Sequence, residues 1–166
     1  MNTLSDIKPH DYARIQEEDF NLIRDTANGI YVEVGTFHGA SAYAASQNAK
    51  KIVTIDIYDW KSKVYEDSCD IYFFKGTAED YSKSFHHYWN IDVLFIDGSH
   101  ELDSVKKDIE ALEPLVREGG IIMFHDYKKE SPTGVYPAVQ EYLKRCNPKI
   151  LREPTKGSSI LKVQKC

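Results

Sequence analysis

Cysteines are scarce in this sequence, and a long apolar segment is missing. The three cysteines, Cys69, Cys146 and Cys166, are odd in number and lack Cys-x-x-Cys spacing, so they predict neither a disulfide framework nor a structural zinc site. Unpaired thiols are typical of a reducing compartment. No apolar run approaches the roughly 18 residues of a membrane span, and the N-terminus has no signal-peptide pattern. We therefore expect a cytoplasmic protein without a membrane partner.

An excess of basic residues is missing as well. Lysine and arginine together number 21, against 26 aspartates and glutamates, which gives a net charge of −5. Nucleic-acid binding depends on clustered Lys and Arg, and the sequence shows no such cluster, so we expect no nucleic-acid partner. A chain of 166 residues can bury roughly 70% of its unfolded surface without a metal or a disulfide. A bound metal would therefore have a functional and not a structural role.

Linkers, internal repeats and low-complexity tracts are also missing from the sequence. We therefore expect a single domain over residues 18–166. Residues 1–17 are polar and mixed, and they predict an N-terminal extension or lid.

The stretch 29–41 combines a strand, a glycine turn and the start of a helix. Its strand residues are β-branched or aromatic except for Glu33, which stands where a buried parallel strand reaches its carboxyl end. Gly35 and Gly39 permit backbone conformations and close approaches that a Cβ would block. A helix of small residues begins near Ser41, and its first N–H groups are expected to face the crevice. This pattern is typical of a small-molecule site.

Strand patterns alternate with helix patterns along the rest of the chain. The predicted strands cover residues 30–34, 51–56, 71–75, 91–97 and 121–124, and two final runs at 149–152 and 159–163 can pair as a hairpin at a sheet edge. The predicted helices cover 19–27, 39–49, a segment with Tyr81, Phe85 and Trp89, then 105–116, which Gly119 and Gly120 are expected to end, and 135–146. This alternation predicts a doubly wound, Rossmann-like α/β fold with a largely parallel sheet and helices on both faces.

Polar residues stand at the carboxyl ends of several predicted strands. They are Glu33, Asp56, Asp97, His125 and Asp126. One acid at a strand end can simply cap the next helix. Because the carboxyl ends of parallel strands meet at one edge, where such folds bind their ligands, the five together predict a binding site.

The glycine turn helps to choose between ligands. Dinucleotide sites usually show Gly-x-Gly-x-x-Gly, whose backbone cradles a pyrophosphate. Here Gly35 and Gly39 are four residues apart, and Glu33 comes just before them. A carboxylate repels a pyrophosphate but attracts a cationic ligand. A nucleotide-dependent oxidoreductase is therefore disfavoured, and a ligand with ammonium and sulfonium groups is favoured.

S-adenosylmethionine is such a ligand. Its amino-acid end suits Glu33, and its ribose diol suits a bidentate acceptor such as Asp56. The turn at residues 76–78 would then border the adenine. The predicted cofactor-binding set is Glu33, Gly35, Gly39, Ser41, Asp56, Gly76, Thr77, Ala78 and Asp97. A non-catalytic protein that binds a cofactor or a partner through the same sheet stays open as an alternative.

Residues 32–41, Val-Glu-Val-Gly-Thr-Phe-His-Gly-Ala-Ser, resemble the first motif of class I S-adenosylmethionine-dependent methyltransferases, and Asp56 matches the acid that ends their second strand. Phe-Ile-Asp97-Gly-Ser-His100 and Phe-His125-Asp126-Tyr127 are similar to segments of small-molecule O-methyltransferases that act on sugars, macrolides or catechols. The resemblance implies a seven-stranded sheet whose last strand is antiparallel. It also implies methyl transfer to a small hydroxylated acceptor, such as a sugar, a polyketide or a phenol.

The metal-dependent members of that group hold magnesium with an acid after the fourth strand and two oxygen ligands after the fifth. By position, the resemblance implies Asp97, His125 and Asp126 as metal ligands. Magnesium prefers oxygen ligands, so a histidine in this set indicates a softer divalent ion, a water-mediated role or no metal.

His100 stands where catechol-type relatives carry a basic residue. An imidazole titrates near neutral pH, which suits a general base for a hydroxyl group. The predicted catalytic residues are therefore His100 and Asp97, and a purely structural hydrogen bond is the alternative role for His100. A homodimer that completes the pocket is possible as well.

Overall fold

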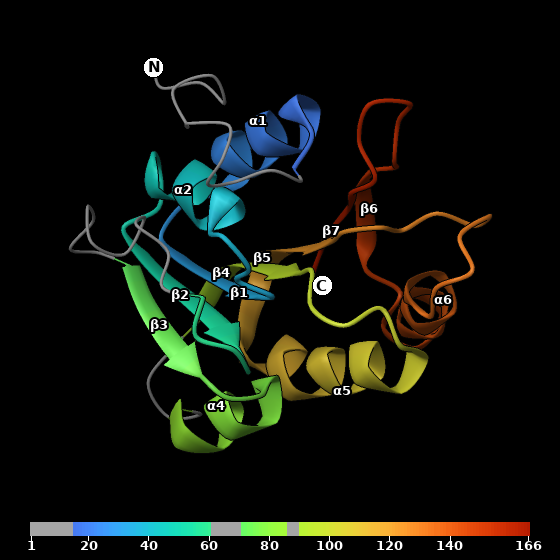
Figure 1. Cartoon of the computed structure of the whole chain (residues 1–166). Coiled ribbons are helices and arrows are strands. Elements are labelled where there is room, and N and C mark those ends of the chain that lie inside the picture. The colour runs from blue at the N-terminus through green and yellow to red at the C-terminus, as the bar shows by residue number, and fades with distance from the viewer. Residues whose placement is uncertain (1–14, 61–70, 86–89) are drawn as a thin grey trace.

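The computed structural model describes residues 15–60, 71–85 and 90–166 (Figure 1). Its strands are β1 (Ile30–Val34), β2 (Lys51–Asp56), β3 (Ile71–Lys75), β4 (Ile91–Ile96), β5 (Val116–Phe124), β6 (Lys149–Arg152) and β7 (Leu161–Gln164). Its helices are α1 (Glu17–Thr26), α2 (Ala40–Ser46), α4 (Ala78–Phe85), α5 (Leu102–Leu112) and α6 (Val135–Cys146). Most of the predicted extension over residues 1–17, Trp89 and Cys69 lie outside the described residues.

The seven strands form one sheet in the order β3-β2-β1-β4-β5-β7-β6. The five strands β3, β2, β1, β4 and β5 are parallel, whereas β7 is antiparallel to both β5 and β6. The predicted fold class and the antiparallel C-terminal hairpin are thereby confirmed. The strand order reverses between β1 and β4, and a switch point of this kind opens a crevice at the carboxyl ends of the strands.

Helices cover both faces of the sheet, as Figure 1 shows with α1 and α2 on one side and α4 and α5 on the other. Two buried apolar clusters match this division. The first joins α1 and α2 to the sheet through Phe20, Ile23, Ala42, Tyr31, Val93 and Phe95. The second joins α4, α5 and α6 to the opposite face through Tyr81, Ile109, Val139, Val32, Leu94 and Ile122. Side chains that alternate along the strands therefore fill two cores.

The boundary between α5 and β5 differs from the prediction. The helix ends at Leu112, a single 3-10 turn covers Glu113–Leu115, and the strand already begins at Val116. Val116 pairs with Ile91 across a register shift in β4. The glycine pair expected to end the helix therefore lies within β5, where a Cβ on Gly120 would come within 2.6 Å of the Val116 side chain. Gly119 and Gly120 therefore permit the irregular path of β5 and do not end a helix.

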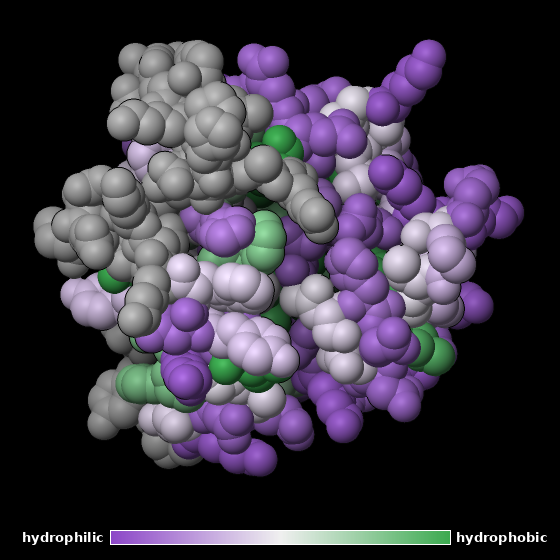
Figure 2. All heavy atoms as spheres, in the orientation of Figure 1, coloured by the Kyte–Doolittle hydropathy of each residue, from purple (hydrophilic) through white to green (hydrophobic). Residues whose placement is uncertain are grey.

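Apolar side chains are largely hidden on the face drawn in Figure 2, where polar residues cover most of the described surface. No described helix has the length and apolarity that crossing a membrane requires. Cys146 and Cys166 are free thiols.

Candidate active site

A cavity of about 910 Å³ opens at the carboxyl ends of the parallel strands. Its wall is formed by the turns after β1, β2, β3, β4 and β5, the first turns of α4 and α5, and part of α1. Of the predicted site residues, Glu33 does not line the cavity, whereas the others do: Gly35, Gly39, Ser41, Asp56, Gly76, Thr77, Ala78, Asp97, His100, His125 and Asp126. The fold therefore brings the predicted residues to one place, with one exception.

The glycine turn after β1 has the conformation that its sequence predicts. Gly35 adopts φ +90° and Gly39 adopts φ +80°, both in the left-handed region. A Cβ on Gly35 would lie 2.0 Å from the backbone oxygen of Asp97. The missing side chain thus lets the turn after β1 pack directly against the turn after β4, and it leaves a backbone cradle at the start of α2.

Glu33 lies behind this turn and is fully buried. The Tyr31 hydroxyl donates to its Oε2 at 3.1 Å. Burial raises the pKa of Glu33 to about 8, although hydrogen bonds from Ser41 and Tyr31 partly offset that shift. A protonated carboxyl at neutral pH offers no negative charge to a cation. Glu33 therefore supports the turn from the core side, and its contact with a cationic ligand stays a prediction.

Asp56, at the end of β2, holds the glycine turn and the chain beyond it. Its Oδ2 accepts hydrogen bonds from the backbone N–H of Thr36 at 3.0 Å and of Phe37 at 3.3 Å. The same oxygen accepts the indole N–H of Trp60 at 3.0 Å, while Oδ1 accepts the backbone N–H of Tyr58 at 2.9 Å. The carboxylate thereby joins two turns at the cavity, and Oδ1 retains room for a further donor.

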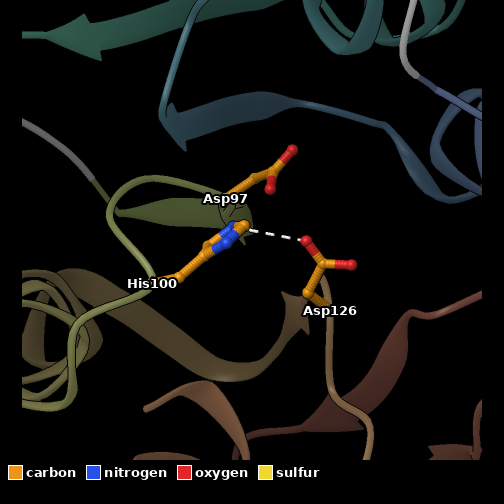
Figure 3. Close-up of side chains that lie close together, drawn as sticks. All are labelled: Asp97, His100 and Asp126. Atoms are coloured by element: carbon orange, nitrogen blue, oxygen red, sulfur yellow. Dashed lines mark ion pairs between the residues drawn. The ribbon is translucent and has the colours of Figure 1, made fainter. Parts of the chain in front are cut away.

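Three predicted residues meet at the other end of the cavity. Asp97 follows β4, His100 lies three residues further on, and Asp126 follows β5 in the left-handed conformation, with φ +53°. The Nε2 atom of His100 lies 3.2 Å from Oδ2 of Asp126, as Figure 3 shows. The His100 side chain is 45% exposed. An imidazole that is oriented by a carboxylate and open to the cavity can exchange a proton with a ligand.

His125 lies deeper, between three carboxylates. Its Nδ1 is 3.0 Å from Asp97 and 3.3 Å from Asp126, and its Nε2 is 3.3 Å from Asp19 of α1. Burial alone lowers the pKa of His125, but its interactions with the three carboxylates outweigh burial and raise the pKa to about 12. The interaction with His125 in turn lowers the pKa of Asp126 to about 2.

This environment changes the candidate metal ligands. A metal ligand must offer a free lone pair on a neutral imidazole, whereas both ring nitrogens of His125 face carboxylates. Asp97, His100 and Asp126 instead offer ligand atoms that lie within 4.8 Å of one another. We therefore replace His125 by His100 in the candidate set. His125 becomes the internal cation that holds the acids together.

Two acids of the cavity wall were not among the predicted site residues. Asp19 is 1% exposed and contacts His125, and Asp108 of α5 lines the cavity. Both acids could have been identified from the sequence, because each interrupts the apolar stripe of its helix. Asp19 precedes Ile23 by four residues, and Asp108 is three residues after Val105. A charge on the buried face of an amphipathic helix requires a partner or a function.

Comparison with known proteins gives a consistent picture. A family model described as "Methyltransferase domain" matches residues 32–127. An uncharacterized protein of Acanthamoeba polyphaga mimivirus is 28% identical over 159 residues, which covers 81% of this chain and 71% of that protein.

Two solved structures share the fold. An O-methyltransferase from Bacillus cereus in complex with S-adenosylhomocysteine superposes with a TM-score of 0.72 at 16% identity, covering 94% of this chain and 85% of that one. The methyltransferase MycE, in complex with Mg, S-adenosylhomocysteine and mycinamycin VI, gives 0.61 at 19% identity, covering 89% of this chain and 47% of that one. At these identities the structural likeness establishes the fold.

Proposed function

This chain belongs to the methyltransferase-domain family, and from that membership we propose that it moves a methyl group from S-adenosylmethionine to a hydroxyl oxygen of a small acceptor. One observation carries the proposal. The glycine turn and Asp56 share a single cavity with Asp97, His100 and Asp126. Two groups of residues, one suited to a nucleoside cofactor and one to proton transfer, therefore line the same cavity.

The glycine-turn end fits the cofactor. The volume of about 910 Å³ falls at the upper end of the roughly 300–1,000 Å³ range usual for ligand sites. A Cβ on Gly35 would collide with the Asp97 backbone, so the cradle exists only because glycine is there. Oδ1 of Asp56 is the oxygen that we expect to meet a ribose hydroxyl. When bound, S-adenosylmethionine supplies an electrophilic methyl group on its sulfonium.

The other end supports removal of the acceptor proton. His100 borders the cavity, and Asp126 lies 3.2 Å from its Nε2. We propose that His100 accepts the hydroxyl proton while Asp126 stabilises the imidazolium that forms. His125 and Asp19 fix the orientation of the two acids. The remaining contribution of the chain is alignment, since an in-line displacement depends on how the reacting atoms are held.

Asp97, His100 and Asp126 also define a second form of the proposal, in which a divalent metal assists. Two carboxylates and one imidazole suit a transition metal ion better than magnesium, which prefers oxygen ligands. An ion held there would lower the pKa of an acceptor hydroxyl. MycE, which shares the fold, was crystallised with Mg and mycinamycin VI. A sugar, a polyketide and a phenol are all acceptors of the expected kind.

Calorimetry provides the first test. We expect S-adenosylhomocysteine to bind the full chain, and NAD to give no comparable heat. The opposite result would contradict the cofactor assignment.

An acceptor screen tests the chemistry. Methyl-labelled S-adenosylmethionine is incubated with hydroxylated sugars, phenols and macrolides, with Mn²⁺ or with a chelator. We expect transfer that falls about 100-fold or more in His100→Ala, the usual size of a general-base contribution. Loss of transfer with the chelator selects the metal-assisted form. Cofactor binding without transfer to any acceptor would favour a non-catalytic protein.

A further inference from the structure

Asp108 is a carboxyl group of the cavity wall to which the proposed chemistry gives no role. It belongs to α5, is half-buried and lines the cavity. Within residues 15–60, 71–85 and 90–166, its side chain makes no hydrogen bond and no ion pair. A carboxyl group that is partly removed from water usually has a partner. Its position on the cavity wall suggests that a ligand provides one.

The neighbours of Asp108 locate it within the cavity. Its Oδ2 lies 3.4 Å from the point that a Cβ on Gly98 would occupy, next to the turn after β4. Glu79, in the first turn of α4, is the charged residue that acts on it most. The helices α4 and α5 pack against each other. Asp108 therefore lies where the starts of α4 and α5 meet the cavity.

Thr77 and Asp80, at the start of α4, already have partners. The Thr77 hydroxyl donates to Oδ2 of Asp80 at 2.7 Å, and the Thr77 backbone N–H donates to the same oxygen at 3.1 Å. These bonds cap the start of α4. Asp80 is therefore committed to the helix. Glu79 also lines the cavity but is exposed, whereas the half-buried Asp108 carboxyl lacks full access to water and can meet a ligand.

The order of the strands indicates which part of the cofactor comes here. The proposed site places the amino-acid end at the glycine turn after β1 and the ribose at Asp56 after β2. The adenine then extends toward the turn after β3, where Ala78 begins α4. The outer edge of adenine carries a ring nitrogen, N1, that accepts a hydrogen bond and a 6-amino group that donates one. That edge would face the junction of α4 and α5.

We infer that Asp108 recognises the adenine of the cofactor by hydrogen bonding to its N1 and 6-amino edge. The inference rests on the proposed function, since it takes S-adenosylmethionine as the ligand. The carboxyl oxygen accepts from the amino group, and the protonated carboxyl also donates to N1, which gives a paired contact. Burial, and to a lesser degree Glu79, raise the pKa of Asp108 to about 7, so the donating form is available near neutral pH.

The binding of S-adenosylhomocysteine by calorimetry tests this inference on the full chain. Asp108→Ala is expected to weaken binding about 10-fold, the effect of one or two hydrogen bonds. Asp108→Asn is expected to stay within about two-fold of the wild type, because an amide also offers one donor and one acceptor to this edge. Ser104→Ala is the matched control, since Ser104 lines the same cavity one turn earlier on α5.

A modified ligand tests the same contact without relying on a variant that might fold poorly. In the 1-deaza analogue of S-adenosylhomocysteine, a C–H replaces N1. We expect this analogue to bind the wild type several-fold more weakly than S-adenosylhomocysteine does, and to bind Asp108→Ala with no further loss. Equal binding of the two ligands by the wild type, or an Asp108→Ala variant that behaves like Ser104→Ala, would overturn the inference. A wild-type protein that binds neither ligand would refute the proposed cofactor itself, which is a different outcome.

Discussion

The two halves of the cavity are built in different ways. The glycine-turn half consists of the turn after β1 and Asp56, and it relies on backbone groups held by one carboxylate, with Asp56 only 20 residues from Thr36 in sequence. The histidine half consists of Asp19, Asp97, His100, His125 and Asp126, and its contacts are between side chains. Asp19 and His125 are 106 residues apart. The first half is a local motif, whereas the second exists only after the chain has folded.

This difference has a consequence for stability. The glycine-turn half satisfies backbone N–H groups, so each contact there adds to a turn that the sequence already favours. The histidine half brings three carboxylates close together where water is partly excluded. The His125 cation offsets their negative charge. Such an arrangement is strongly destabilised when a single partner is removed. The two halves should therefore respond differently to substitution.

The largest effect is expected for His125→Ala. The change leaves Asp19, Asp97 and Asp126 without the cation between them, and Asp19 is 1% exposed. We expect the free energy of unfolding to fall by about 3–5 kcal/mol, measured by urea denaturation at pH 7. His100→Ala is the control, because its side chain is 45% exposed and forms an ion pair with Asp126 alone among the described residues, and it should cost about 1 kcal/mol or less. Equal losses in the two variants would show that His125 does not hold this half together.

A smaller effect is expected for Asp56→Ala, now on ligand binding. The variant removes the carboxylate that holds four N–H groups and that we propose for the ribose. Losing charged hydrogen bonds of about 1.5–3 kcal/mol should weaken S-adenosylhomocysteine binding roughly 10- to 100-fold in calorimetry. His100→Ala, in the other half, should leave that affinity within about two-fold. If both variants weakened binding alike, the division of the cavity into two functional halves would be wrong.

The last prediction concerns the pH dependence of stability through Glu33. Burial raises its pKa from 4.5 to about 8, so between these values the folded protein retains a proton that the unfolded chain releases. The stabilising contribution is complete below pH 4.5 and is lost as the pH rises toward 8. The loss is at most about 1.4 kcal/mol per pH unit.

Glu33→Gln removes the titrating group while keeping the shape of the side chain. We expect the unfolding free energy of the variant to fall less between pH 5.5 and 7.5 than that of the wild type, measured by urea denaturation at both values. The exposed Glu130→Gln serves as the control and should follow the wild type. Parallel pH profiles for Glu33→Gln and the wild type would mean that Glu33 is ionised in the folded protein.

Much of the fold could be predicted because its signals are local. Alternating and three-to-four-residue apolar spacings located the strands and helices, and Gly35 and Gly39 marked the turn. The end of α5 could not be placed in the same way. Pro114 and the pairing of Val116 with Ile91 start β5 early, and that pairing depends on a strand distant in sequence. Of the glycines that suggested a helix end, Gly120 is instead required by close packing within the strand and Gly119 by its φ of +70°.

The sequence by itself determined the order of the elements and the residues at the strand ends, because side-chain periodicity and glycine conformation act over a few residues. Only the tertiary structure decided the partners of those residues. It buried Glu33 behind the turn, surrounded His125 with three carboxylates and brought Asp108 to the cavity wall. The charge state and the accessibility of a side chain depend on every element packed around it, and those elements come from distant parts of the chain.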